Sequence, residues 1–152
     1  MSQPTQEILS DDILIRRVPP SSDSFATVAP TGTGRFRAAS SVMSVRNSED
    51  ALSCSLLRLT SPVQLLEHLR SQQIDPIGWQ VCAFLVGDVQ SLEFEVEFSP
   101  IAGGDIGHCG IRNPLQGGPK FPNAKAKELA KRTVILNDEE IRDPSRIRAL
   151  FT

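Results

Sequence analysis

His108 is the residue in this sequence best suited to acid–base chemistry. An imidazole changes its charge near neutral pH, which makes histidine a frequent general base. Gly107 and Gly110 flank His108, and glycines in a strand allow a backbone or a ligand to come close. Asp105 precedes His108 by three residues and is a candidate for orienting the ring. His108 is therefore a candidate catalytic base, with a histidine hydrogen-bonded to its sheet neighbours as the alternative.

Arginines near the N-terminus are candidates for binding an anion. Arg16 and Arg17 end an apolar run, and adjacent strand residues point to opposite faces, so one of them is expected to face inward. A buried guanidinium needs an anionic partner, either a carboxylate or a ligand phosphate. Arg35 follows a Gly-Thr-Gly sequence at 32–34, and such a loop can place its guanidinium on an anion. Arg17 and Arg35 are therefore candidate anion-binding residues, with an ordinary loop as the alternative for Arg35.

Two oppositely charged segments are candidates for binding a partner. Residues 93–98 alternate between glutamate and apolar residues, which is typical of a strand with one buried and one acidic face. Residues 112–132 hold six basic residues against one acid, a local charge of +5 in a chain of formal charge −2. An acidic protein, a nucleic acid and solvent are the alternatives there, and Phe121 is the only ring nearby to stack a base. The candidate partner-binding residues are Glu93, Glu95, Glu97, Lys125, Lys127 and Lys131.

The three cysteines form no motif for metal binding or catalysis. Cys54, Cys82 and Cys109 have no C-x-x-C spacing, and two histidines are too few for an ordinary structural zinc site. Cys109 adjoins His108, but neighbours in a strand point to opposite faces. No nucleophile-elbow, phosphate-loop or H-E-x-x-H motif is present. We therefore expect no metal and no cofactor, and thiols buried in a reducing compartment.

The elements that position these residues follow from periodicity and capping signals. Ser61, Pro62 and Gln64 predict a helix start, and the helix at 61–72 places His68 on its polar side. Residues 47–59 fit either a short helix or a strand. Further helices are predicted at 124–132 and from 143 to 151. Strands are predicted at 12–18, 41–46, 79–86, 93–98, 108–112 and 133–136.

This order of elements does not alternate as a doubly wound sheet would, so it favours the α+β class. We expect one domain at 12–152, with a mixed sheet of about five strands packed by two or three helices. Residues 1–11 are expected to be a disordered tail, and 19–40 a long loop. No run approaches the roughly 18 apolar residues that span a bilayer, and residues 1–12 lack the apolar core of a secretory signal. A cytoplasmic protein without membrane association is expected.

The sequence resembles a group of small uncharacterised bacterial proteins. The shared features are Arg-Arg-Val-Pro at 16–19, Met-Ser-Val at 43–45, Ser-Pro at 61–62 and the His-x-Gly-Ile stretch at 108–111 before a basic helix. This resemblance implies a bacterial source and no established activity. The chain is also similar, more distantly, to RES-type and other ADP-ribosyltransferase-like domains. That similarity rests on an arginine ending the first strand, Arg16 or Arg17, and on Gly34-Arg35-Phe36. Such enzymes rely on a later glutamate or tyrosine, whereas this chain has no tyrosine and no glutamate in a matching place.

Together these features favour a non-catalytic interaction or accessory protein of a larger bacterial assembly, bound to a protein partner. The opposed acidic segment at 93–97 and basic segment at 112–132 are its candidate contacts. Nucleic acid is a less favoured partner, because the sequence pI of about 5.7 gives no global attraction to phosphate. The alternative is a small enzyme acting on a nucleotide or phosphorylated substrate, with His108 as base and with Arg17 and Arg35 as anion clamps.

Overall fold

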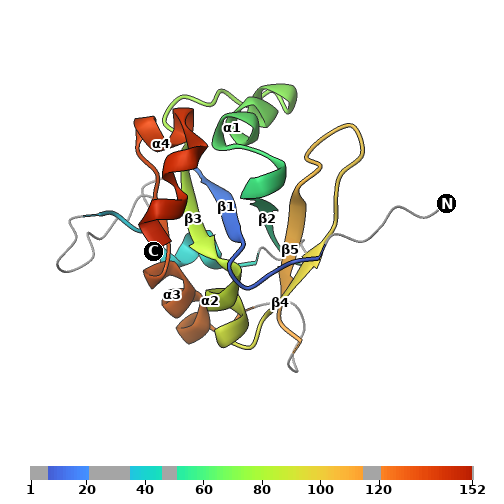
Figure 1. The fold of residues 1–152 in the computed structure, drawn as a ribbon, viewed down its shortest axis with the longest axis vertical. Helices are drawn as coiled ribbons and strands as arrows, with labels where there is room; N and C mark the ends of the chain where they lie inside the picture. Colours follow the sequence, from blue (N-terminus) through green and yellow to red (C-terminus); the bar gives the residue numbers. More distant parts are fainter. Residues whose placement is uncertain (1–6, 21–34, 46–50, 115–120, 152) are drawn as a thin grey trace.

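The computed structural model describes residues 7–20, 35–45, 51–114 and 121–151. They form one α+β domain on a six-stranded sheet of order β4-β5-β2-β1-β3-β6 (Figure 1). Every ladder recorded between these strands is antiparallel. The α+β prediction is confirmed, with six strands in place of about five and antiparallel pairing in place of a mixed sheet. The strands are β1 (Ile13–Val18), β2 (Leu52–Leu56), β3 (Gln80–Leu85), β4 (Glu95–Phe98), β5 (His108–Arg112) and β6 (Val134–Ile135).

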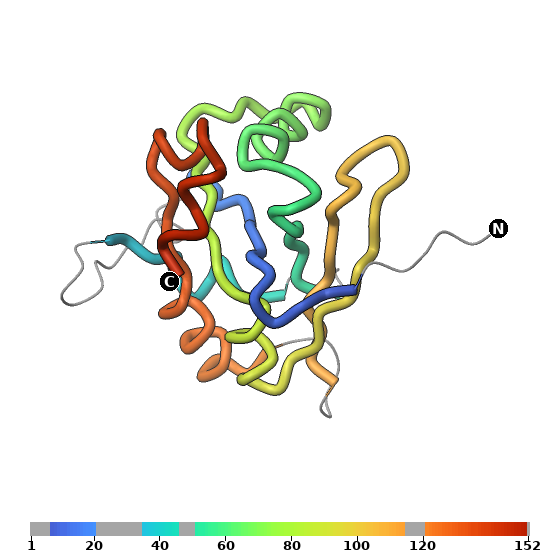
Figure 2. The backbone as a smooth tube through the Cα atoms, viewed as in Figure 1, coloured from blue at the N-terminus to red at the C-terminus, as the bar shows by residue number. Residues whose placement is uncertain are grey.

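Helices cover both faces of this sheet. In Figure 2, α1 and the C-terminal segment occupy the upper part of the domain, and α2 and α3 the lower part. The upper set comprises α1 (Pro62–Ser71), α4 (Asp138–Arg142), η3 (Pro144–Arg146) and η4 (Arg148–Phe151). The lower set comprises η1 (Ser40–Met43), α2 (Val86–Ser91) and α3 (Asn123–Lys131), and η2 (Leu57–Leu59) joins β2 to α1.

Alternation along the strands divides the core into two clusters. Leu14 and Val18 of β1 belong to the larger cluster, which includes side chains of η1, α2 and α3. Ile13 and Ile15 belong to the smaller cluster, which includes Leu65 of α1. Since successive side chains of a strand point to opposite faces, the two clusters mark the two faces of the sheet. The smaller cluster occupies only the β1, β3 and β6 part of its face.

The helix start predicted at residue 61 is confirmed. The side chain of Ser61 accepts a hydrogen bond from the backbone N–H of Gln64 at 3.2 Å, and Pro62 occupies the first helical position. Proline suits this position because its missing N–H has no partner in the first turn. The cap therefore fixes where α1 begins beside the sheet.

The strand predicted at residues 41–46 is wrong. Residues 40–43 form η1, a 3-10 helix, and Val42, Met43 and Val45 are buried. Both edges of β1 are paired, one with β2 and the other with β3. The segment η1 therefore does not pair with β1, and its apolar side chains pack against α3. Two short helices, α2 and α4, were not predicted.

Parts of two predicted flexible segments lie among the described residues. Of the predicted tail, residues 1–6 lie outside the described part of the chain, whereas 7–11 contact the domain. Gly87 donates a backbone hydrogen bond to Ser10 at 2.8 Å, and Arg58 donates to the carbonyl of Glu7 at 2.6 Å. Most of the predicted 19–40 loop, 21–34, also lies outside, as does the helix start considered at residue 47. Within the described ranges, no helix has the length and apolar content to cross a membrane.

Candidate functional site

One face of the sheet is apolar at one end and polar at the other. The register places Ile15 opposite Ser55, and Ser55 opposite His108, so these three side chains share the face that carries α1. Arg17 stands on the same face, two residues after Ile15. On this face β2 carries Ser53 and Ser55, and β5 carries His108 and Gly110, so the side chains above this part of the sheet are mostly small. The polar end of the face is therefore hollow.

A pocket of about 610 Å³ opens over this polar end. Its walls are α1, the 72–79 connection and the 99–107 connection, and the last of these extends beyond the sheet towards α1 (Figure 1). We call it the α1 pocket. Its polar lining includes Arg17, Ser53, Ser55, His68, Asp105 and His108, and its apolar lining includes Leu65, Leu69, Ile74, Trp79 and Ile101.

Arg17 is a half-buried cation in the α1 pocket. Its Nη1 lies 3.4 Å from the carbonyl oxygen of Leu65, and it forms no ion pair with any carboxylate in the described residues. Burial lowers the pKa of Arg17, and the charge of Asp105 opposes part of that shift. The side chain of Arg16 instead donates through Nε to the carbonyl oxygen of Val42 at 2.8 Å, on the other face. Arg17 thus stands on the α1 side of the sheet, whereas the guanidinium of Arg16 lies on the side of the larger cluster.

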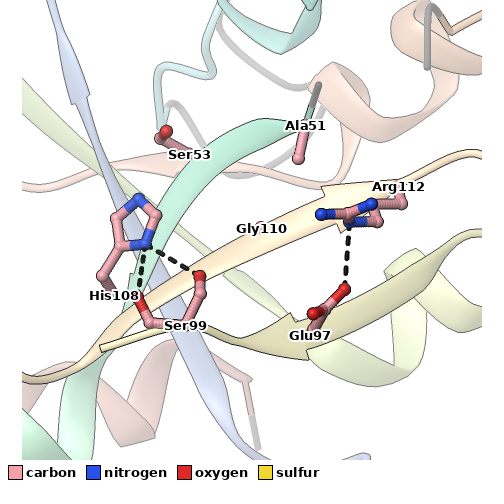
Figure 3. Close-up of a pocket in the computed structure, with 7 residues that line it drawn as sticks. All are labelled: Ala51, Ser53, Glu97, Ser99, His108, Gly110 and Arg112. Carbon is pink, nitrogen blue, oxygen red and sulfur yellow. Dashed lines mark hydrogen bonds and ion pairs between the residues drawn. The ribbon is translucent and has the colours of Figure 1, made fainter. Parts of the chain in front are cut away.

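His108 is fixed by one residue of the neighbouring strand end. Its Nδ1 lies 3.0 Å from both the hydroxyl and the carbonyl oxygen of Ser99. A carbonyl oxygen can only accept, so Nδ1 carries the hydrogen of this bond. The other ring nitrogen points away from Ser99 (Figure 3). In the neutral ring that nitrogen, Nε2, has a lone pair free to accept a proton.

The sequence suggested that Asp105 orients the ring of His108. In the structure the carboxylate of Asp105 has other partners. Its carboxylate accepts hydrogen bonds from the hydroxyl of Ser55 and from the backbone N–H of Gly107, the latter at 3.0 Å. Both oxygens of the carboxylate therefore have donors. Asp105 instead fixes the 99–107 connection to β2, since Ser55 belongs to that strand.

A smaller hollow of about 260 Å³ adjoins the α1 pocket and shares Ser53 and His108 with it. Gly110 has no side chain to fill this hollow. A Cβ atom at this position would lie only 2.9 Å from Cβ of Ala51. Arg112 pairs with Glu97 at 3.0 Å on its outer side (Figure 3). His108 therefore stands between two hollows. The glycines beside His108 were expected to let a backbone or a ligand come close. At Gly110 the group that comes close is Ala51 of the same chain.

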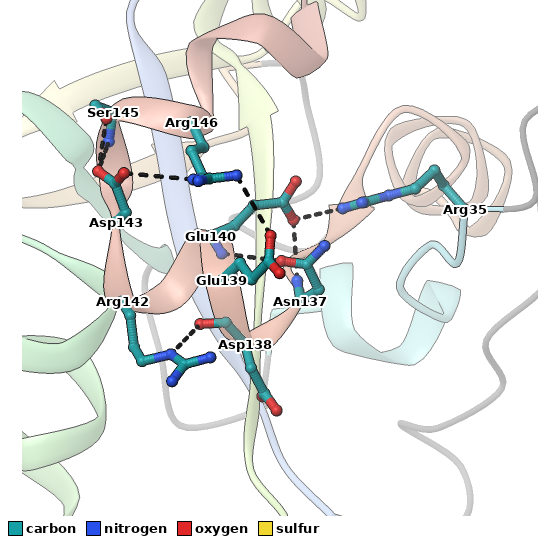
Figure 4. Close-up of polar contacts among 9 residues, drawn as sticks. All are labelled: Arg35, Asn137, Asp138, Glu139, Glu140, Arg142, Asp143, Ser145 and Arg146. Carbon is teal, nitrogen blue, oxygen red and sulfur yellow. Dashed lines mark hydrogen bonds and ion pairs between the residues drawn. The ribbon is translucent and has the colours of Figure 1, made fainter.

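Arg35 lies in neither pocket lining. Its Nη2 forms a 2.6 Å ion pair with Glu140 and also donates to the carbonyl oxygen of Ile135 at 3.0 Å (Figure 4). Glu140 in turn accepts from the backbone N–H of Asn137 at 2.9 Å, completing a capping box at the start of α4. The structure thus brings Arg17 and His108 together but places Arg35 in a contact with α4.

The candidate partner-binding residues lie on two separate elements. Glu95 and Glu97 are exposed on β4, which is an edge strand, and Glu93 precedes it with a positive φ of 68°. On α3, Lys131 pairs with Glu128 at 3.1 Å, and Nζ of Lys125 lies 5.5 Å from the ring centroid of Phe94. Lys127 is exposed. The acidic and basic segments meet in the pair of Glu97 with Arg112.

The three cysteines are buried and free. Burial raises the pKa of Cys82 to about 12, and that of Cys109 likewise to about 12. Burial also raises the pKa of Cys54 well above its ordinary value. Thiolates are the nucleophilic form, so these thiols are unreactive at neutral pH. Among the residues that the structure describes, no cluster of His, Cys, Asp and Glu is arranged to hold a metal ion.

Sequence reasoning missed several residues of the α1 pocket. His68 was expected to face solvent, but it is half-buried and lines the pocket. Leu65, three residues earlier, and Gln72, four residues later, also line the pocket. Residues at these spacings share one face of a helix, and this spacing was the available signal for His68. Trp79 had no such signal, because its role depends on how the 72–79 connection folds back towards α1. The same holds for Ser99, which lines the smaller hollow and holds His108.

Comparison of the chain with models of protein families, with curated proteins and with solved structures finds no match in any of the three.

Proposed function

We propose that the chain is a small enzyme acting on a phosphorylated substrate that binds in the α1 pocket. The observation that carries this proposal is the presence of Arg17 and His108 in the lining of one pocket of about 610 Å³. That volume lies within the range of roughly 300–1,000 Å³ typical of small-molecule sites. The proposal keeps two of the three residues named for the enzyme alternative and leaves out Arg35.

Arg17 supports the binding of an anion. Removing a guanidinium from water is unfavourable unless an opposite charge or good acceptors replace the water. Its recorded acceptor is the Leu65 carbonyl at 3.4 Å, which is a long hydrogen bond. A phosphate offers several acceptor oxygens and matches the planar fork of a guanidinium. The substrate's phosphate would supply the partner that Arg17 lacks among the described residues.

His108 supports proton transfer beside that phosphate. Nε2 would accept a proton from a water molecule as the water oxygen attacks phosphorus. The bond from phosphorus to the ester oxygen then breaks on the opposite side of phosphorus, where the leaving oxygen takes a proton from solvent water, and His108 returns its own proton to solvent. Binding by Arg17 and proton transfer by His108 together make a hydrolytic enzyme for phosphate esters.

Trp79 provides a direct test, because it is the only tryptophan in the chain and lines the α1 pocket. We expect inorganic phosphate and pyrophosphate to change its fluorescence in a saturable way. Arg17→Gln should abolish the response. Arg70→Gln is the matched control, because Arg70 is an exposed arginine of α1 that pairs with Glu67 at 3.7 Å. An unchanged response in Arg17→Gln would overturn the proposal.

A protein-binding role is the second candidate, and the edge position of β4 favours it. Among the residues that the structure describes, β4 pairs only with β5, so its other edge could accept an added strand. Glu95 and Glu97 would then attract a basic partner segment. Charged side chains also protect edge strands from aggregation, so their presence alone does not decide between the two roles.

We further propose a cytoplasmic location. The three cysteines of the chain are all free and buried, which suits a reducing compartment. Fractionation of the host cells tests this directly, and recovery of the protein outside the cytoplasm would contradict it.

A further inference from the structure

The α1 pocket has two walls of different chemistry. Towards the sheet lie Arg17, Ser53, Ser55 and His108, which offer charge and hydrogen bonds. Towards α1 and the two connections lie the apolar residues Leu65, Leu69, Ile74, Trp79 and Ile101, which we call the apolar wall, together with the polar residues His68, Ser71, Gln72 and Asp105. A bare phosphate would use only the first wall.

The isoleucine side chains at the outer end of the apolar wall are exposed to solvent. Ile74 is 39% exposed and Ile101 is 48% exposed, although both line the pocket. Beside them in the same two connections, Ile77 is 80% and Ile106 is 60% exposed. These four are among the large apolar side chains exposed in the described part of the chain. Exposed apolar groups gathered at a pocket mark a surface that a ligand covers.

From this division we infer that the substrate is a phosphate ester of an apolar alcohol, with an aryl or alkyl group lying against Ile74, Trp79 and Ile101. The inference rests on the proposed function, since it needs the phosphate on Arg17. An aryl group would gain further from contact with the ring of Trp79. The pocket volume leaves room for such a group beyond the phosphate.

A sugar phosphate fits the part of the pocket formed by Ile74, Trp79 and Ile101 less well. Sugar hydroxyls need hydrogen-bond partners, and burying them unpaired is unfavourable. His68, Ser71 and Gln72 line the same side of the pocket and could meet some of these hydroxyls, but Leu65, Leu69, Ile74 and Ile101 offer no side-chain donor or acceptor. An aryl or alkyl group has no such requirement, and its burial removes both its own surface and that of the isoleucines from water.

The test compares four ligands by isothermal titration calorimetry and by Trp79 fluorescence. They are inorganic phosphate, glycerol 1-phosphate, phenyl phosphate and hexyl phosphate. We expect phenyl and hexyl phosphate to bind at least about tenfold more tightly than glycerol 1-phosphate. A hydrophobic pocket discriminates to this extent between ligands that differ in their apolar groups. Their binding should also show a more negative heat-capacity change, which marks apolar burial.

Variants assign the preference to the apolar wall. Ile74→Ser combined with Ile101→Ser should remove the advantage of the apolar esters and leave the affinity for inorganic phosphate unchanged. Ile77→Ser is the matched control, because Ile77 is more exposed and does not line the pocket. It should keep the full preference.

Two failures are distinguishable. If none of the four ligands binds, the proposed function itself is overturned. If inorganic phosphate and glycerol 1-phosphate bind as tightly as the apolar esters, the phosphate site stands and the inference about the apolar group is overturned.

Discussion

Nδ1 of His108 lies 3.0 Å from the carbonyl oxygen of Ser99, and this contact sets the tautomer of the ring. The same two residues are joined a second time, because the backbone N–H of Ser99 donates to the carbonyl of His108 at 2.9 Å. The ring is thus held by backbone at the point where β4 and β5 separate. In many enzymes a carboxylate orients the catalytic imidazole, whereas a peptide carbonyl orients the ring of His108.

Replacing His108 tests its role as base. His108→Ala should lower the rate of phosphate release from phenyl phosphate by about a hundredfold or more, since general-base catalysis contributes factors of roughly 10²–10⁴. Ser99→Ala is the control, because it removes the hydroxyl and keeps the carbonyl that holds Nδ1. We expect it to retain most of the activity. The melting temperature of His108→Ala should stay close to that of the wild type, and a fall of many degrees would identify a structural histidine.

Arg35 and Glu140 are expected to contribute to stability and not to binding. Arg35→Ala removes the ion pair of 2.6 Å and leaves a carboxylate that is 8% exposed. Leaving a buried polar group with fewer partners costs about 1–3 kcal/mol, which urea unfolding can measure. Arg146→Ala removes only exposed ion pairs and should change stability by about 0.5 kcal/mol or less. If phosphate changed the fluorescence of Trp79 less in folded Arg35→Ala than in the wild type, Arg35 would instead belong to the binding site.

The buried thiols predict a loss of stability at alkaline pH. Burial raises the pKa of Cys82 from 9.0 to about 12, so between these values the unfolded chain releases a proton that the folded chain keeps. Stability from this group is therefore complete below pH 9 and falls as pH rises towards 12. The slope is about 1.4 kcal/mol per pH unit for one such group. Cys82→Ala should reduce the slope of unfolding free energy against pH by about that amount, and an unchanged slope would contradict the prediction.

Charge reversal tests the second candidate function. Changing Glu95 and Glu97 to lysine should abolish capture of a basic protein partner, and changing Lys125, Lys127 and Lys131 to glutamate should abolish capture of an acidic one. The melting temperature is read in parallel, because Lys125 lies over the ring of Phe94. Arg17→Gln should capture the partner as well as the wild type does. If neither set of reversals alters what is captured, these charges do not form the interface.

Local signals predicted the elements that carry the site. The strand predicted at 108–112 matches β5, and the Ser61 and Pro62 signals match the start of α1. Both are determined by residues close in sequence, through alternation and capping. The capping box of α4 was present in the sequence as Asn137 followed by Glu140, and it was missed. The start of α2 had no comparable signal, because the apolar run continues from β3 into Val86 without a side-chain cap.

The site itself depended on contacts between distant residues. Arg35 lies outside the α1 pocket and pairs with Glu140, which comes 105 residues later in the chain. Likewise, Asp105 was near His108 in sequence, yet its hydrogen bond goes to Ser55 on another strand. Periodicity fixes which face a side chain points to, but it does not say which elements close over that face.

The division of one sheet face into an apolar and a polar end has a consequence for how this scaffold can diversify. Arg17, Ser53 and His108 stand on strands whose opposite face belongs to the larger apolar cluster, so replacing them removes little of the packing that holds the domain together. New side chains at these positions would alter ligand preference at small cost in folding free energy. A scaffold of this kind can acquire different chemistries by substitution at a few positions while the rest of the chain stays the same.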